Sequence, residues 1–125
     1  MEEKIFQTVF DKLVDFLPDG WKNMVFFAGY TNDSYTMKFY SENGNKEYID
    51  CFNMPEVSKT SLIQSFMEID KVLSPQRKDL GDKAWTVFTM KVDSDGHMKA
   101  EYDYDDHSED MVDYEETWKS CGFNN

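Results

Sequence analysis

The sequence predicts an α+β fold: one domain with an antiparallel β-sheet of about five strands packed with helices, in the order α-β-β-β-α-β-β-α. Two segments have apolar residues at helical spacing, one near the start and one in the middle of the chain. Between and after them lie short runs rich in aromatic and β-branched residues, separated by turn-forming segments. A length of 125 residues suits one domain with one core, so residues 1–125 are expected to form a single domain.

The chain is expected to begin with a helix whose apolar residues share one face and whose charged residues share the other. The sequence Pro18-Asp19-Gly20 should end it. The predicted buried positions are Ile5, Phe6, Val9, Phe10, Leu13, Val14 and Leu17.

Three strands should follow, at residues 24–30, 35–40 and about 46–52, with residues 31–34 as the first turn. The dipeptide Asn43-Gly44 favours a type I′ hairpin turn, because both central positions of that turn need a positive φ. Three sequential strands with short turns make an antiparallel meander.

A second helix should begin at a cap formed by Ser58 or Thr60. It should end at Ser74-Pro75, because proline inside a helix removes a hydrogen bond. Residues 76–83 are then expected to be a polar, mobile connection. The predicted buried stripe is Leu62, Ile63, Phe66, Ile69, Val72 and Leu73.

Two more strands are predicted at about residues 85–92 and 97–104, joined by a turn at 93–96, before a short helix at 108–121. The fifth strand alternates, since side chains along a strand point to opposite faces. One face would carry Met98, Ala100, Tyr102 and Tyr104 as core residues. The other, solvated face would carry His97, Lys99, Glu101, Asp103 and Asp105.

Acidic residues are concentrated near the C-terminus, where residues 93–116 hold 11 of the 25 carboxylates and only Lys99 opposes them. Like charges this close destabilise a strand face. Three interpretations stay open: a solvated surface, a surface for a basic protein partner, or a metal or catalytic site. The last defines the alternative function, a small metal-dependent enzyme or metal-binding domain that uses Asp103, Asp105, Asp106 and His107.

The segment Asp93-Ser-Asp95-Gly96 does not fit a calcium-binding EF-hand loop. In that loop glycine comes later, and position 12 is a bidentate glutamate, whereas position 12 here is Tyr104. The sequence also lacks a glycine-rich phosphate loop and a GxSxG motif. We therefore expect no catalytic residues, no metal and no cofactor.

The net charge of -12 disfavours binding to nucleic acid or to an anionic membrane and favours a basic partner. Cys51 and Cys121 are expected to be reduced thiols, because two cysteines make no disulfide framework. The N-terminus has no basic segment followed by an apolar one, and the longest apolar run, residues 24–30, is too short to cross a bilayer. The expected location is the cytoplasm.

The block AWTVFTMKVDSDGHMKAEYDYDD, residues 84–106, resembles the signature of the YezG-like immunity proteins, which are antitoxins of polymorphic bacterial toxin systems. That signature has a Trp-Thr that opens a strand, a turn with glycine, and a strand that ends in Tyr-Asp-Tyr and further acids. The segment LPDGWKNMVFFAGY and the tripeptide Asn53-Met54-Pro55 are also similar to family features, so the resemblance covers most of the chain.

The resemblance implies a non-enzymatic inhibitor that binds the C-terminal domain of a toxin, commonly a nuclease, inside the producing cell. Nucleases that grip phosphate present basic clefts, and an acidic surface suits such a cleft. The partner-binding residues predicted on this basis are Glu101, Asp103, Asp105, Asp106, Glu109 and Asp110.

Overall fold

The computed structural model describes residues 2–17, 19–31, 35–44, 48–54, 57–81 and 84–104. Within them the elements run in the order α1, β1, β2, β3, α2, β4 and β5, as the sequence predicts. The helix expected at residues 108–121 lies outside the described residues. The bounds are α1 Glu2–Leu13, β1 Asn23–Tyr30, β2 Tyr35–Glu42, β3 Ile49–Asp50, α2 Lys59–Leu80, β4 Val87–Asp93 and β5 Met98–Asp103.

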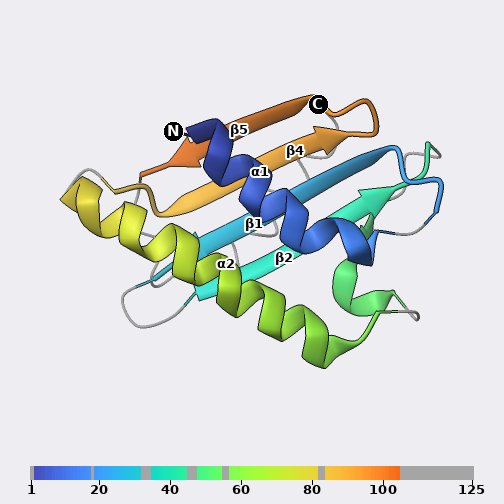
Figure 1. Ribbon diagram of the computed structural model, residues 1–125, viewed down its shortest axis with the longest axis horizontal. Helices are drawn as coiled ribbons and strands as arrows, with labels where there is room; N and C mark the ends of the chain where they lie inside the picture. Colours follow the sequence, from blue (N-terminus) through green and yellow to red (C-terminus); the bar gives the residue numbers. More distant parts are fainter. Residues whose placement is uncertain are drawn as a thin grey trace.

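The five strands form one antiparallel sheet in the order β3-β2-β1-β4-β5 (Figure 1). Strand β1 is central and pairs along its length with β2 and β4, for example Phe26 with Phe39 and with Met90. The short β3 and the longer β5 are the two edges.

Both helices lie across the same face of the sheet (Figure 1). Val9 and Leu13 of α1 and Phe66 and Ile69 of α2 are buried in the cluster that also contains Phe26 of β1. The predicted amphipathic faces of the two helices are thus confirmed in their main members, although Ile63 is 52% exposed. An ion pair of 3.5 Å joins Lys12 of α1 to Glu68 of α2.

The opposite face of the sheet, called the second face below, is also buried along its centre. Val25 and Phe27 of β1 alternate with the helix-facing residues and are 2% and 0% exposed. Tyr40 of β2 and Val87 of β4 are buried there too. The unbroken apolar run of β1 is typical of a strand covered on both sides, not of a half-solvated one.

Helix α2 does not end at Ser74-Pro75 as predicted but continues to Leu80, with Pro75 inside it. The final turn is held by tertiary contacts: Arg77 Nε donates to the backbone oxygen of Trp85 over 2.9 Å. Gly81 then caps the helix with a positive φ of 59°, and its N–H donates to the backbone oxygens of Arg77 and Lys78. The expected polar, mobile connection is therefore wrong for residues 76–80.

The hairpin between β2 and β3 exists, but the predicted type I′ turn and the long third strand are wrong. A two-residue turn at Asn43-Gly44 would pair Glu42 with Asn45, whereas the observed register pairs Ser41 with Ile49. Strand β3 stops after Asp50, because the carboxylate of Asp50 accepts the N–H of Phe52 over 2.9 Å and starts a 3-10 turn, Cys51–Asn53.

Candidate functional site

Two of the predicted partner-binding residues, Glu101 and Asp103, lie on β5. They occupy positions that alternate with the core-facing Ala100 and Tyr102, and so belong to the second face. Glu101 has a side chain that is 61% exposed. Asp103 is half-buried, and its backbone oxygen accepts both the N–H and the hydroxyl of Thr86, over 2.7 and 3.1 Å. Asp105, Asp106, Glu109 and Asp110 lie outside the described residues, as does His107 of the alternative metal site.

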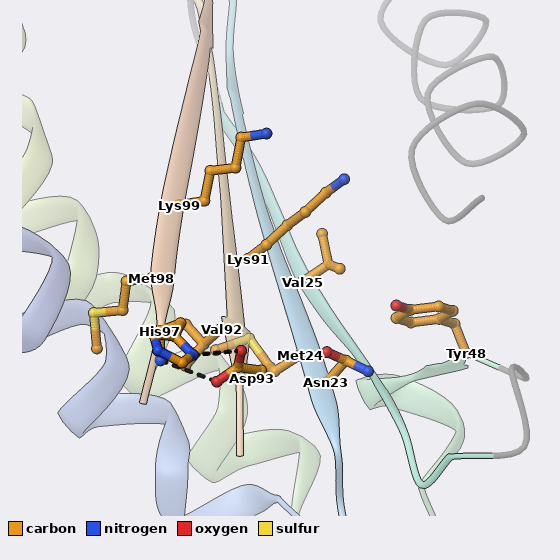
Figure 2. Close-up of a pocket in the computed structure, with 10 residues that line it drawn as sticks. All are labelled: Asn23, Met24, Val25, Tyr48, Lys91, Val92, Asp93, His97, Met98 and Lys99. Atoms are coloured by element: carbon orange, nitrogen blue, oxygen red, sulfur yellow. Dashed lines mark hydrogen bonds and ion pairs between the residues drawn. The ribbon is translucent and has the colours of Figure 1, made fainter. Parts of the chain in front are cut away.

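The structure adds a second lysine to this surface, which sequence analysis had missed. The β4–β5 register places Lys91 directly opposite Lys99, and Glu101 lies 4.0 Å from Lys99. Figure 2 shows both lysine side chains extending toward the same side of the strands, beside a small hollow of about 190 Å³ that Asn23 and Tyr48 also line. The described part of the acidic surface is therefore mixed in charge.

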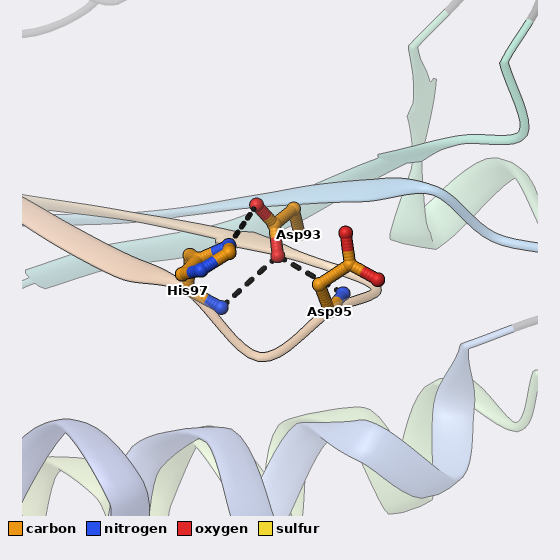
Figure 3. Close-up of polar contacts among 3 residues, drawn as sticks. All are labelled: Asp93, Asp95 and His97. Carbon is orange, nitrogen blue, oxygen red and sulfur yellow. Dashed lines mark hydrogen bonds and ion pairs between the residues drawn. The ribbon is translucent and has the colours of Figure 1, made fainter.

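The turn between β4 and β5 is organised by the carboxylate of Asp93 (Figure 3). One oxygen accepts the backbone N–H groups of Asp95 and His97, each over 3.0 Å. The other lies 3.0 Å from Nδ1 of His97. The hydrogen bond from the backbone of His97 is the main reason that the pKa of Asp93 lies below its usual value. Gly96 has a φ of 92° and completes the predicted turn.

Asp93, Asp95 and His97 bring potential metal-ligand atoms within 4.8 Å of one another. Both oxygens of Asp93 already have partners within the turn, so the cluster is explained by the local fold. Carboxylates on an exposed turn of this kind need no ion to hold them together.

Tyr104 is not a core residue, contrary to the prediction. It follows the last residue of β5 and is 62% exposed. Tyr102 does pack into the core: its ring centroid lies 5.4 Å from Phe88 and 6.2 Å from Trp85. The alternation therefore holds within the strand and stops where the pairing with β4 stops.

Cys51 is buried and free, as expected. Burial raises the pKa of its thiol from 9.0 to about 12. A thiol with so high a pKa is a poor nucleophile at neutral pH. Cys121 lies outside the described residues.

Among the described residues, neither helix has the length and apolar character required to span a membrane.

Comparison with known proteins gives one consistent result. The model of the family described as "Immunity protein YezG-like" matches residues 2–124. "Immunity protein YezG" of Bacillus subtilis (strain 168) is 26% identical over 111 residues, which cover 83% of this chain and 74% of that protein. The protein of the same description in Bacillus spizizenii is 25% identical over 109 residues, which cover 82% of this chain and 68% of that protein.

Proposed function

The chain belongs to the YezG-like immunity protein family, and from this premise we propose that it neutralises a cognate toxin by direct binding, without catalysis of its own. The match over residues 2–124 is the observation that carries the proposal, because it spans nearly the whole chain and supports an immunity role. Such an inhibitor has to bind the toxin inside the cell that it protects, so we propose that the protein acts in the cytoplasm.

The partner's chemistry follows from charge. With 25 acidic against 13 basic residues, the chain attracts a cationic surface. Toxins that cleave nucleic acid bind phosphate through basic clefts, so a nuclease is the partner class that this charge fits best. Electrostatic attraction of this kind raises the association rate and disfavours wrong partners.

The proposed contact surface starts at β5 and continues with the acids that follow it. Glu101 supports this assignment because its side chain is 61% exposed and β5 is an edge strand of the sheet that the described residues form. Asp103, Asp105, Asp106, Glu109 and Asp110 complete the proposed surface on the strength of sequence alone. Lys91 and Lys99 lie on one side of Glu101, so the contact is expected to extend away from them, toward Asp103 and beyond.

The test uses the toxin domain encoded next to the gene of this protein. Its affinity is measured by titration calorimetry for the wild type and for the variant with Asp103, Asp105 and Asp106 each changed to Lys. We expect binding by the wild type and at least a tenfold loss in the variant, which corresponds to about 1.4 kcal/mol or more. Matched reversals of two exposed acids elsewhere, Asp19→Lys and Asp79→Lys, should change affinity less than threefold.

Two outcomes would count against the proposal in different ways. If the wild type does not bind the toxin domain, the role itself is wrong for this pair. If the triple variant binds and protects cells as well as the wild type does, the acids are a solvated edge and the contact lies on another surface.

A further inference from the structure

A groove of about 560 Å³ opens at one end of the helical layer, far along the sheet from the acidic strand β5. It lies where the 3-10 turn that follows α1 (Val14–Phe16), the edge strand β3 and the start of α2 meet. Its apolar lining consists of Phe16, Leu17, Ile49, Met54 and Val57. Its volume is in the range of sites that accept a ligand or a protein side chain.

Ile49 distinguishes this groove from an ordinary solvent-exposed surface. It lies on the two-residue edge strand β3 and is 49% exposed, although it is a large β-branched residue. The remaining apolar lining residues are half-buried and continue inward to the core, where the ring of Phe16 packs against Phe39 at 6.4 Å. The groove thus leads from an exposed isoleucine down to the hydrophobic core.

Polar groups limit what the groove would accept. Ser41 is 2% exposed and lines the groove. Asp15 is exposed at the rim and is the one charged side chain among the described lining residues. A carboxylate there, on a chain with a net charge of -12, favours a basic group over an acidic one.

We propose that this groove is a second docking surface for the toxin, which inserts a large apolar side chain flanked by a basic one. The inference rests on the proposed immunity function and names a partner feature that the acidic surface alone does not. Exposed charges act mainly on association rate, whereas tight complexes depend on a few anchors buried in pockets. The acidic strand attracts the partner, and the groove supplies an anchor that slows its dissociation.

The chain offers a closely matched pair of variants for the test. Ile49 lines the groove, whereas Ile63 on α2 does not line it and is similarly exposed, at 49% and 52%. We expect Ile49→Lys to weaken binding of the neighbouring-gene toxin domain at least tenfold, mainly through faster dissociation. Ile63→Lys should change affinity less than twofold. Ile49→Ala, which adds no charge at the strand edge, should weaken binding in the same direction, and melting curves establish that each variant is folded.

A second pair tests the charge at the rim. Asp15→Lys should weaken binding about fivefold or more, while Asp11→Lys, an exposed acid on α1 outside the groove, should change it less than twofold.

The outcomes separate this inference from the proposed function. If the wild type binds and the β5 variants weaken binding, but the Ile49 variants bind like the wild type, the groove proposal is overturned and the immunity function stands. Equal losses for Ile49→Lys and Ile63→Lys would also overturn it, because the effect would then be unspecific. If the wild type does not bind at all, both proposals fail together.

Discussion

The guanidinium carbon of Arg77 lies 4.5 Å from the ring centroid of Tyr30, and this contact joins the last turn of α2 to the central strand of the sheet. The same group lies 5.4 Å from the ring of Trp85, whose backbone oxygen accepts the Nε hydrogen of Arg77. The hydroxyl of Tyr30 donates a hydrogen bond to the carboxylate of Asp70, over 2.7 Å, and Asp70 precedes Arg77 in the same helix. These contacts join the end of β1, the C-terminal part of α2 and the segment before β4, close to the end of the helix that passes through Pro75.

Replacing Arg77 should lower the stability of the fold, because it removes these contacts. Arg77→Met keeps the aliphatic stem but removes the cation–π contacts and a charged hydrogen bond, so we expect a loss of about 2–3 kcal/mol in the free energy of unfolding. Lys78→Met, at the exposed neighbouring position, should cost about 0.5 kcal/mol or less. Urea denaturation measures both, and equal losses would contradict the assigned role of Arg77.

The two tyrosines of the acidic strand should respond differently to truncation. Tyr102→Ala removes a half-buried ring that contacts Phe88 and Trp85, at an expected cost of about 2–4 kcal/mol. Tyr104→Ala affects a side chain that is 62% exposed, so the expected cost is about 0.5 kcal/mol or less. Thermal or urea unfolding of the two variants distinguishes them. A large loss for Tyr104→Ala would mean that this residue is part of the core after all.

Cys51 should be unreactive in the native protein. With Cys121→Ser as the background, Ellman's reagent should modify Cys51 slowly at pH 8 and rapidly in urea, because the folded thiol has a pKa of about 12 and no solvent access. The raised pKa means that its contribution to stability is present below pH 9 and is lost as pH rises toward about 12. Rapid modification without denaturant would contradict the burial of this thiol.

The stability of the β4–β5 turn should depend more on the carboxylate of Asp93 than on that of Asp95. Asp93→Asn should lower the melting temperature at pH 7 more than Asp95→Asn does, because only Asp93 bonds the backbone of His97. The pKa of Asp93 is depressed in the folded state, so its contribution is present above pH 3.8 and is lost as pH falls through the folded value. The difference between the variants should therefore shrink in acid.

A metal ion bound at this turn would change how the melting temperature responds to added cations. Zinc, calcium or magnesium would then raise the melting temperature of the wild type but not of Asp93→Asn. We expect a shift of about one degree or less in either protein, since the oxygens of Asp93 are already engaged within the turn.

The sequence was sufficient for the class, the order and most bounds of the fold, because those depend on local periodicity. The stripe of α1, the cap at Ser58 and the alternation of β5 up to Tyr102 are local patterns of this kind. The errors arise where distant residues override local preference. Pro75 favours a helix end, but the contacts of Arg77 with Tyr30 and Trp85 stabilise another turn. Asn43-Gly44 favours a tight turn, but the pairing of Ser41 with Ile49 leaves a longer loop.

The candidate site was less predictable for the same reason. Acid density in the sequence indicated the region of Glu101 and Asp103, but only the strand register shows that Lys91 lies opposite Lys99. The groove at Ile49 could not be inferred from any one segment. Its lining comes from the 3-10 turn after α1, from β2 and β3, from the segment that contains Asn53, Met54 and Val57, and from the start of α2. The unbroken run of β1 was the one available signal that the second face is buried.

The most direct test of the central claim is a calorimetric titration of the neighbouring-gene toxin domain with this protein, at about 0.05 M and about 0.5 M salt. The account predicts a stable complex at low salt whose affinity falls at least tenfold at high salt, and loss of toxin activity in proportion to the complex formed. A toxin domain that stays active and unbound at low salt, in the presence of excess folded protein, would contradict it.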